Sequence, residues 1–164
     1  MMIPMYLLNE TYDKAIFANI ACYITTLHQT WLVNSAAHLF GNQPYDKTID
    51  PRENKGVVYL SMGEGYHNYH HTFPWDYSAS EHGWRGNFNP ATAFIDFMAW
   101  CGQVTDRKMP KHELIMKRVQ RTGETAILPK TISGFRYLLD FLIGMFTATW
   151  SIWFIFGMRA ILVK

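Results

Sequence analysis

A long stretch without charge sets the first constraint on the fold. Residues 15–33 contain no Asp, Glu, Lys or Arg, although three amide and imidazole side chains interrupt their apolar character. As a helix rising about 1.5 Å per residue, these nineteen residues nearly match the roughly 30 Å hydrocarbon core of a bilayer. Asp13 stands just before the stretch, where a carboxylate suits a helix N-terminus. A buried helix of a soluble protein fits this pattern too, but we favour a membrane helix over about residues 10–40.

The overall composition fits a membrane protein that carries a large polar part. Nearly half of the 164 residues are hydrophobic and 16% are aromatic, yet the mean hydropathy is only −0.09. A net charge of +2 without a dense Lys/Arg tract argues against nucleic acid as a partner. The two cysteines, Cys22 and Cys101, have no metal or redox spacing, and we expect them to be reduced and buried.

Three histidines are gathered in five residues as His-x-x-His-His, at His67, His70 and His71. Positions i, i+3 and i+4 share one face of a helix, so the three imidazoles can converge. Neutral imidazole is a ligand for iron, copper and zinc. No cysteine or carboxylate alternates with these histidines, which argues against a thiolate-type zinc site. Taken alone, the same pattern also fits surface or core histidines that bind no metal.

The histidine segment has clear predicted ends. Gly63 and Gly65 flank Glu64 and allow the backbone to turn sharply before the first histidine. Pro74 disfavours a helical conformation at the residue before it, so the histidine helix should end near Thr72.

A polar stripe follows one side of the apolar helix. At 100° per residue, His28, Trp31, Asn34 and His38 fall within about 120° of one another. Polar side chains inside a membrane tend to face protein or a cavity rather than lipid. We interpret His28 as a packing or hydrogen-bonding residue.

The remaining segments alternate between loops and short helices. Residues 42–61 read as a polar loop with short structure, and Pro90 should begin a helix whose apolar side belongs to the core or to a membrane surface. Residues 111–121 read as a basic amphipathic helix, which fits either a solvated face or contact with anionic headgroups or an acidic partner. Residues 141–158 carry no charge and are long enough for a second membrane helix.

Two long motifs resemble the membrane acyl-CoA desaturases, the stearoyl-CoA Δ9-desaturase family. The block 63–77 matches that family's last histidine box, close to Gly-Glu-Gly-x-His-Asn-Tyr-His-His-x-Phe-Pro-x-Asp-Tyr, at each fixed position. The block 31–38 reads Trp-Leu-Val-Asn-Ser-Ala-Ala-His and is followed by further matches up to Asn54. The resemblance covers roughly residues 1–124.

The resemblance implies a mainly α, integral membrane helical protein with a cytosolic, histidine-rich helical part. Residues 1–124 would be the C-terminal half of a desaturase domain, with residues 42–124 in the cytosol. Residues 125–164 would be a divergent tail containing the candidate membrane helix 141–158, a departure from the family. We expect the chain to be the second half of a longer protein, or the product of a truncated gene model.

The family's site residues carry over onto matching positions. The resemblance makes His38, His67, His70 and His71 metal ligands, and it lets Asn34 reach the metal through water. Trp31 would form a wall of the acyl tunnel. His82 and His112 match no ligand position. We expect His82 to lie at the surface and His112 to be packed or half-exposed.

The resemblance also implies an activity with its cofactor and partners. The family uses a di-iron centre and O2 to introduce a cis double bond at the Δ9 position of a saturated fatty acyl-CoA, in unsaturated fatty acid biosynthesis. Its electrons come from NADH through a reductase and a b-type cytochrome. The expected location is the endoplasmic reticulum membrane, in contact with lipid and multi-pass in the full-length family, with no role for nucleic acid.

This sequence lacks part of the family's pattern. The two earlier histidine boxes do not occur before His38, and four histidines cannot complete two six-coordinate irons. We therefore expect no activity from this chain alone. Two alternatives stay open: a hydroxylase or another type of histidine-box desaturase, and a catalytically inactive desaturase-like membrane protein that binds a partner.

Overall fold

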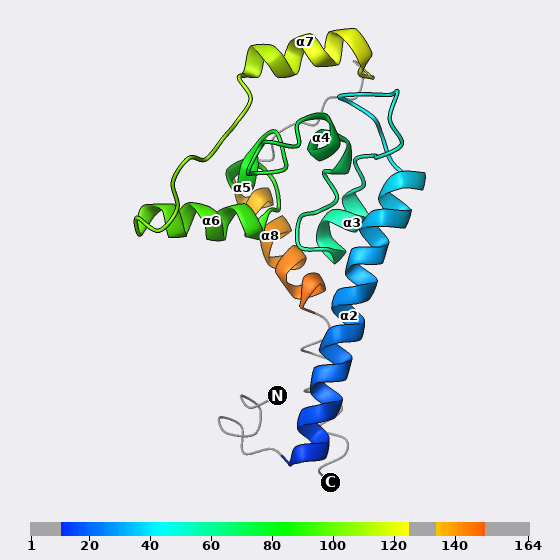
Figure 1. Ribbon diagram of the computed structural model, residues 1–164, viewed down its shortest axis with the longest axis vertical. Coiled ribbons are helices and arrows are strands. Elements are labelled where there is room, and N and C mark those ends of the chain that lie inside the picture. Colours follow the sequence, from blue (N-terminus) through cyan, green and yellow to red (C-terminus); the bar gives the residue numbers. More distant parts are fainter. Residues whose placement is uncertain (1–10, 125–133, 150–164) are drawn as a thin grey trace. The chain divides into compact units, whose positions relative to one another are not determined.

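The computed structural model describes residues 11–124 and 134–149, and these residues are mainly helical (Figure 1). They contain no β-strand, only isolated bridges that join Glu53 to Asn42 and to Tyr66. The chain divides into two compact units, one formed by residues 1–31 with 149–164 and the other by residues 32–148. The sequence-based expectation of a mainly α protein is confirmed for the described part of the chain.

The first unit contributes most of α2, which runs from Tyr12 to Leu39 as one uninterrupted helix. The helix predicted over residues 15–33 is thus confirmed, and Asp13 lies in its first turn as expected. Large apolar side chains are exposed along its first part, including Phe17, Ile20 and Tyr23. Within the described ranges, none of the helices is both long and apolar enough to cross a membrane.

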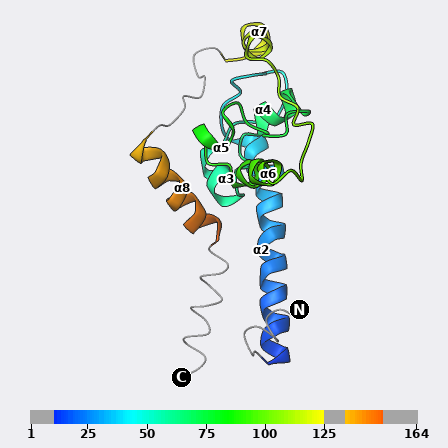
Figure 2. The same ribbon diagram turned by 90° about the vertical axis from the view of Figure 1, so that its left-hand side faces the viewer.

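Among its described residues, the second unit contains the last turns of α2 and six further helices (Figure 2). In chain order these are α3 (Lys55–Leu60), α4 (His67–Thr72), α5 (Gly83–Gly86), α6 (Pro90–Trp100), α7 (His112–Thr122) and α8 (Phe135–Ala148). The predicted end of the histidine helix near Thr72 and the predicted start at Pro90 are both confirmed.

Residues 52–54 connect the end of α2 to the start of α4. On one side, the Arg52 N–H donates to Ala37 O at 2.6 Å, and Glu53 and Asn42 exchange backbone hydrogen bonds. On the other side, the Asn54 N–H donates to Gly65 O at 2.9 Å. Gly65 allows this close approach because a Cβ there would lie 2.3 Å from Val58 N. The segment therefore brings two distant histidine-bearing helices together.

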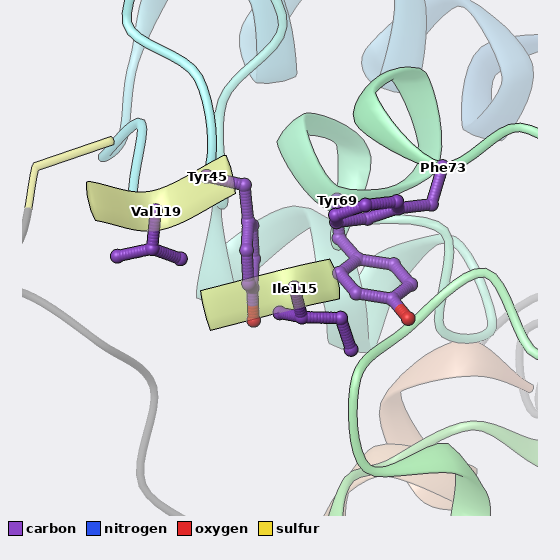
Figure 3. Close-up of a cluster of buried hydrophobic side chains, with 5 residues drawn as sticks. All are labelled: Tyr45, Tyr69, Phe73, Ile115 and Val119. Carbon is purple, nitrogen blue, oxygen red and sulfur yellow. The ribbon is translucent and has the colours of Figure 1, made fainter. Parts of the chain in front are cut away.

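An aromatic cluster beneath α4 forms one core of the second unit. Tyr45 packs edge-on against Tyr69 with ring centroids 4.9 Å apart, and Phe73 completes the aromatic group. Ile115 and Val119 of α7 cover these rings, as Figure 3 shows. The predicted basic amphipathic helix is thus confirmed, with its apolar side facing this core.

A second core holds α8 against α3. Val58 and Phe88 are buried there, and Phe141 and Met145 of α8 pack against them. α8 begins six residues before the predicted stretch 141–158, of which the part beyond residue 149 lies outside the described residues.

Several predicted environments are wrong. Cys22, within α2, and Cys101, the residue that follows α6, are both exposed rather than buried. His112, the first residue of α7, is exposed rather than packed or half-exposed, and its Nδ1 lies 3.9 Å from Glu81 Oε1. On α6, Phe94 and Phe97 are exposed, so the core alternative for this face is wrong within the described residues, whereas the membrane-surface alternative stays a prediction.

Candidate metal centre

Two histidines from distant parts of the chain meet at the end of α2. His38 lies in the last turn of α2 and is half-buried, whereas His67 is the first residue of α4 and only 7% exposed. Their Nε2 atoms are 3.0 Å apart. At this distance either the N–H of one ring donates a hydrogen bond to the other ring, or both rings direct their lone pairs at a shared cation.

His71 completes a group of three. It lies one turn after His67 on α4. Its ring centroid is 4.4 Å from that of His67 and 5.9 Å from that of His38. One ring nitrogen from each of these three histidines lies within 4.8 Å of the others. We call His38, His67 and His71 the histidine cluster.

His70 lies beside this cluster rather than in it. Its ring centroid is 5.5 Å from that of His71 and 6.1 Å from that of His67. Its Nδ1 atom is buried and has no hydrogen-bond partner among the described residues. A buried ring nitrogen without a partner is costly, and a metal ion is one way to satisfy it.

The spacing of the cluster suits a metal ion. Two nitrogens bound to one metal by bonds of about 2.1 Å lie about 3.0 Å apart when the bonds meet at a right angle. They lie about 4.2 Å apart when the bonds are opposite. The distance between His38 and His67 matches the first arrangement, and the other ligand atoms need only a small closure. The donor set is purely imidazole, which suits iron, copper or zinc.

Electrostatics keep the cluster ready to bind a cation. Burial, together with the nearby imidazoles of His71, His38 and His70, lowers the pKa of His67 to about 4. Burial and the neighbouring rings also lower the pKa of His71. Both rings are therefore neutral at pH 7 and keep a lone pair for a metal.

A second polar group in this unit has a different composition. The Asp96 carboxylate accepts hydrogen bonds from Tyr77 Oη at 2.8 Å, from Trp84 Nε1 at 2.8 Å and from Arg107 Nη1 at 2.6 Å. We call these four residues the Asp96 cluster, and they line an open surface pocket. Each donor is matched to a carboxylate oxygen, so the group is balanced without a bound ion.

Sequence comparison finds homologous proteins. A stearoyl-CoA desaturase 5 from Bos taurus is 53% identical over 124 residues, which cover 75% of this chain and 36% of that protein. An acyl-CoA Δ9 desaturase from Acheta domesticus is 56% identical over 124 residues, or 74% of this chain and 34% of its own length. A stearoyl-CoA desaturase from Homo sapiens is 52% identical over 124 residues, which cover 75% of this chain and 34% of that protein. Over the matched residues, this chain is homologous to acyl-CoA Δ9 desaturases and stearoyl-CoA desaturases.

The chain spans about a third of the length of the curated desaturases that it matches. No family model matches the chain. The iron implied by the desaturase family fits the histidine cluster, since three imidazole nitrogens converge and a fourth histidine beside them has an unpartnered buried nitrogen.

The two remaining residues of the predicted desaturase site lie along α2. Asn34 is exposed one turn before His38, in the same unit as the histidine cluster. Trp31 is 54% exposed and contacts His28 edge-on, with ring centroids 5.4 Å apart. His28 is itself exposed and makes only this ring contact within the described part of the chain, and the proposed roles of Asn34 and Trp31 stay predictions.

Sequence reasoning assigned no role to two polar residues that hold the histidine helix α4. Glu53 Oε1 accepts a hydrogen bond from the Tyr69 N–H at 2.9 Å, and burial raises the pKa of Glu53 to about 8. Asn68 is fully buried between the histidines of α4. The sequence showed the position of Asn68 inside the histidine box but did not indicate its hydrogen-bond partners.

Proposed function

We propose that this chain carries part of the iron centre of a fatty acyl-CoA Δ9 desaturase, acting in unsaturated fatty acid biosynthesis. The observation that carries the proposal is the convergence of His38 with His67 and His71, from helices far apart in the sequence. The identity of 52–56% to acyl-CoA Δ9 desaturases and stearoyl-CoA desaturases supports the substrate class.

In this proposal four histidines hold iron and one amide assists them. His38, His67 and His71 supply three ring nitrogens. His70, which also lies on α4, supplies a fourth. Asn34, one turn before His38, would reach the metal through water. The site is half of a di-iron centre, and the ligands that complete it would come from chain segments outside this sequence.

Bound iron with O2 supplies the oxidising power that removes two hydrogens from an unactivated methylene pair, which no side chain can do. The residues of this chain hold the metal, keep its ligands neutral and shape the approach of the acyl chain. Trp31 would form one wall of the acyl tunnel. We propose a b-type cytochrome as the electron donor.

Exposed apolar surfaces support a location at the endoplasmic reticulum membrane, with lipid as a further partner. The first part of α2 exposes Phe17 and Ile20, and α6 separately exposes Phe94, Phe97 and the 82% exposed Trp100. Tryptophan and phenylalanine on an amphipathic helix are typical of the membrane interface. We place residues 42–124 on the cytosolic side and keep residues 125–164 as a divergent tail with a candidate membrane helix over 141–158.

A chimaera tests the proposed activity. Residues 1–124 are joined to the N-terminal part of a working acyl-CoA desaturase and expressed in desaturase-deficient cells, and the fatty acids are analysed. We expect the chimaera to restore Δ9 monounsaturated fatty acids. His70→Ala and His67→Ala in the chimaera should abolish the product, because loss of a ligand disables the metal.

The chain alone serves as the control. We expect the chain of residues 1–164 to restore no unsaturated fatty acid, because half of the ligands are missing. A well-expressed chimaera without product would contradict the proposed activity and favour a desaturase-like protein that acts by binding a partner. Product from the isolated chain would contradict the proposed division of the iron site.

A further inference from the structure

Asn68 occupies a distinctive place in the histidine helix. It lies directly after His67 and two residues before His70, and its side chain is 0% exposed. Successive helical residues are turned by about 100°, so Asn68 lies about 100° around α4 from His67 and about 60° from His71. Its contacts show that the amide is directed at the loop of residues 45–51.

The Asn68 amide uses its full hydrogen-bonding capacity on this loop. Its Oδ1 accepts from the backbone N–H of Tyr45 at 2.9 Å and of Asp46 at 3.1 Å. Its Nδ2 donates to Asp46 O at 2.8 Å and to Pro51 O at 2.9 Å. An asparagine side chain offers two acceptor sites and two donors, so all four are satisfied.

The loop is itself fixed at both ends. Arg118 of α7 forms an ion pair with Asp46, and the Lys47 N–H donates to Thr122 O at 2.9 Å. Immediately after the loop, the Arg52 N–H donates to Ala37 O, one residue before His38. The loop therefore links Asn68 on α4 to the end of α2.

We propose that Asn68 is a positioning residue that holds His67 and His71 against His38 through residues 45–51. Asn68 contacts no ligand atom, and its effect is on the distance between the two histidine-bearing helices. The inference rests on the proposed function to the extent that the histidine cluster binds metal. Loss of a residue that orients metal ligands costs about ten- to a hundredfold in metal affinity.

The chain offers a matched control in Asn89. This residue is also buried, at 4% exposed, and its amide donates to Ser78 O at 2.6 Å and accepts from the Thr92 N–H at 3.1 Å. Asn89 is the N-cap residue of α6, the helix that carries Asp96. Asn89→Ala removes a comparable set of buried hydrogen bonds but leaves the hydrogen bonds between Asn68 and residues 45–51 in place.

The experiment uses the full chain in detergent, with Co²⁺ as the metal probe. Affinity for Co²⁺ and the melting temperature of the metal-free chain are measured for wild type, Asn68→Ala and Asn89→Ala. We expect both variants to lose thermal stability to a similar extent. Only Asn68→Ala should weaken Co²⁺ binding, by about ten- to a hundredfold. Equal Co²⁺ affinities for the two variants would overturn the positioning role.

A milder variant covers the case in which Asn68→Ala does not fold. Asn68→Asp keeps the size and an acceptor oxygen but loses the two donated hydrogen bonds, so it should weaken Co²⁺ binding by about tenfold. Unchanged affinity in a folded Asn68→Asp chain would contradict the proposal.

A metal-free readout separates this inference from the proposed function. Ring-to-ring nuclear Overhauser effects between His38 and His67 should be present in wild type and Asn89→Ala and absent in the Asn68 variants. If wild type shows these contacts but binds no Co²⁺, the metal site fails and the positioning role stands. If the contacts persist in the Asn68 variants, the positioning role fails whatever the metal does.

Discussion

The histidine cluster and the Asp96 cluster both join polar side chains from separate segments, but their hydrogen-bonding balance differs. In the Asp96 cluster, three donors meet one carboxylate, and each pair is satisfied within the protein. In the histidine cluster, nitrogens meet nitrogens, and a buried nitrogen of the adjacent His70 has no partner among the described residues. The Asp96 cluster is therefore complete as a structural element, whereas the histidine cluster gains most from a bound cation.

The largest expected effect is on metal binding by the histidine cluster. His67→Ala removes the nitrogen that lies 3.0 Å from His38 Nε2. We expect Fe²⁺ affinity to fall by more than about 100-fold, above the cost of losing a residue that merely orients a ligand. Anaerobic equilibrium dialysis of the full chain measures it. Asp96→Asn should leave the Fe²⁺ affinity unchanged. A similar loss of Fe²⁺ affinity in both variants would contradict the claim that only the histidine cluster binds the metal.

The two regions should also differ in their tolerance of a methyl group. At Gly65, before α4, an added Cβ would meet Val58 N at 2.3 Å, so Gly65→Ala should lower the free energy of unfolding by about 3 kcal/mol. At Gly83 a Cβ would meet only Thr92 Cγ2 at 3.8 Å, but φ is +54°. Gly83→Ala should therefore cost about 1 kcal/mol. Denaturant unfolding of both variants checks the order, and the reverse order would be inconsistent with close packing before α4.

Acidification should weaken the histidine region first. The pKa of His67 is lowered to about 4, so the unfolded chain binds a proton more readily than the folded chain between pH 6.5 and 4. Its contribution to stability is complete above pH 6.5 and declines toward pH 4, by on the order of 2 kcal/mol. The lowered pKa of Asp96 matters only below its ordinary value of 3.8.

The pH dependence is measured as a difference between wild type and His67→Gln. This difference is needed because burial raises the pKa of Glu53 to about 8, so Glu53 lowers stability as pH rises from its ordinary 4.5 toward 8. We expect the stability of His67→Gln to fall less than that of wild type between pH 6.5 and 4. Parallel curves would mean that His67 titrates normally.

The smallest effect is expected for stability in the Asp96 cluster. Asp96→Asn keeps an acceptor for Tyr77 or Trp84 but removes the charge opposite the exposed Arg107. We expect a loss of about 1 kcal/mol in the free energy of unfolding, typical of one hydrogen bond. Thermal denaturation measures it, and a loss as large as that of Gly65→Ala would show that this pocket is a main structural support.

Local features of the structure were predictable from the sequence because they depend on neighbouring residues. Pro74 and Pro90 set the end of α4 and the start of α6 through the fixed backbone of proline. The spacing of His67 and His71 placed both rings on one face, where their centroids are 4.4 Å apart.

Long-range features were not predictable from local patterns. The approach of His38 to His67 depends on residues 52–54, whose backbone pairs with Asn42 on one side and with Gly65 on the other. No periodicity in the sequence encodes that pairing. The four hydrogen bonds of Asn68 were hidden for the same reason, because their partners lie 17 to 23 residues away. The motif of the desaturase family supplied His38 as a ligand candidate, and periodicity alone did not.

The most direct test of the central claim is iron K-edge X-ray absorption on the iron-loaded chimaera that contains residues 1–124. Our account predicts a shell of nitrogen neighbours at about 2.1 Å with the multiple scattering of several imidazoles, reduced in His67→Ala. A shell of oxygen neighbours without an imidazole signal, or a spectrum unchanged in His67→Ala, would contradict the claim that these histidines hold the iron.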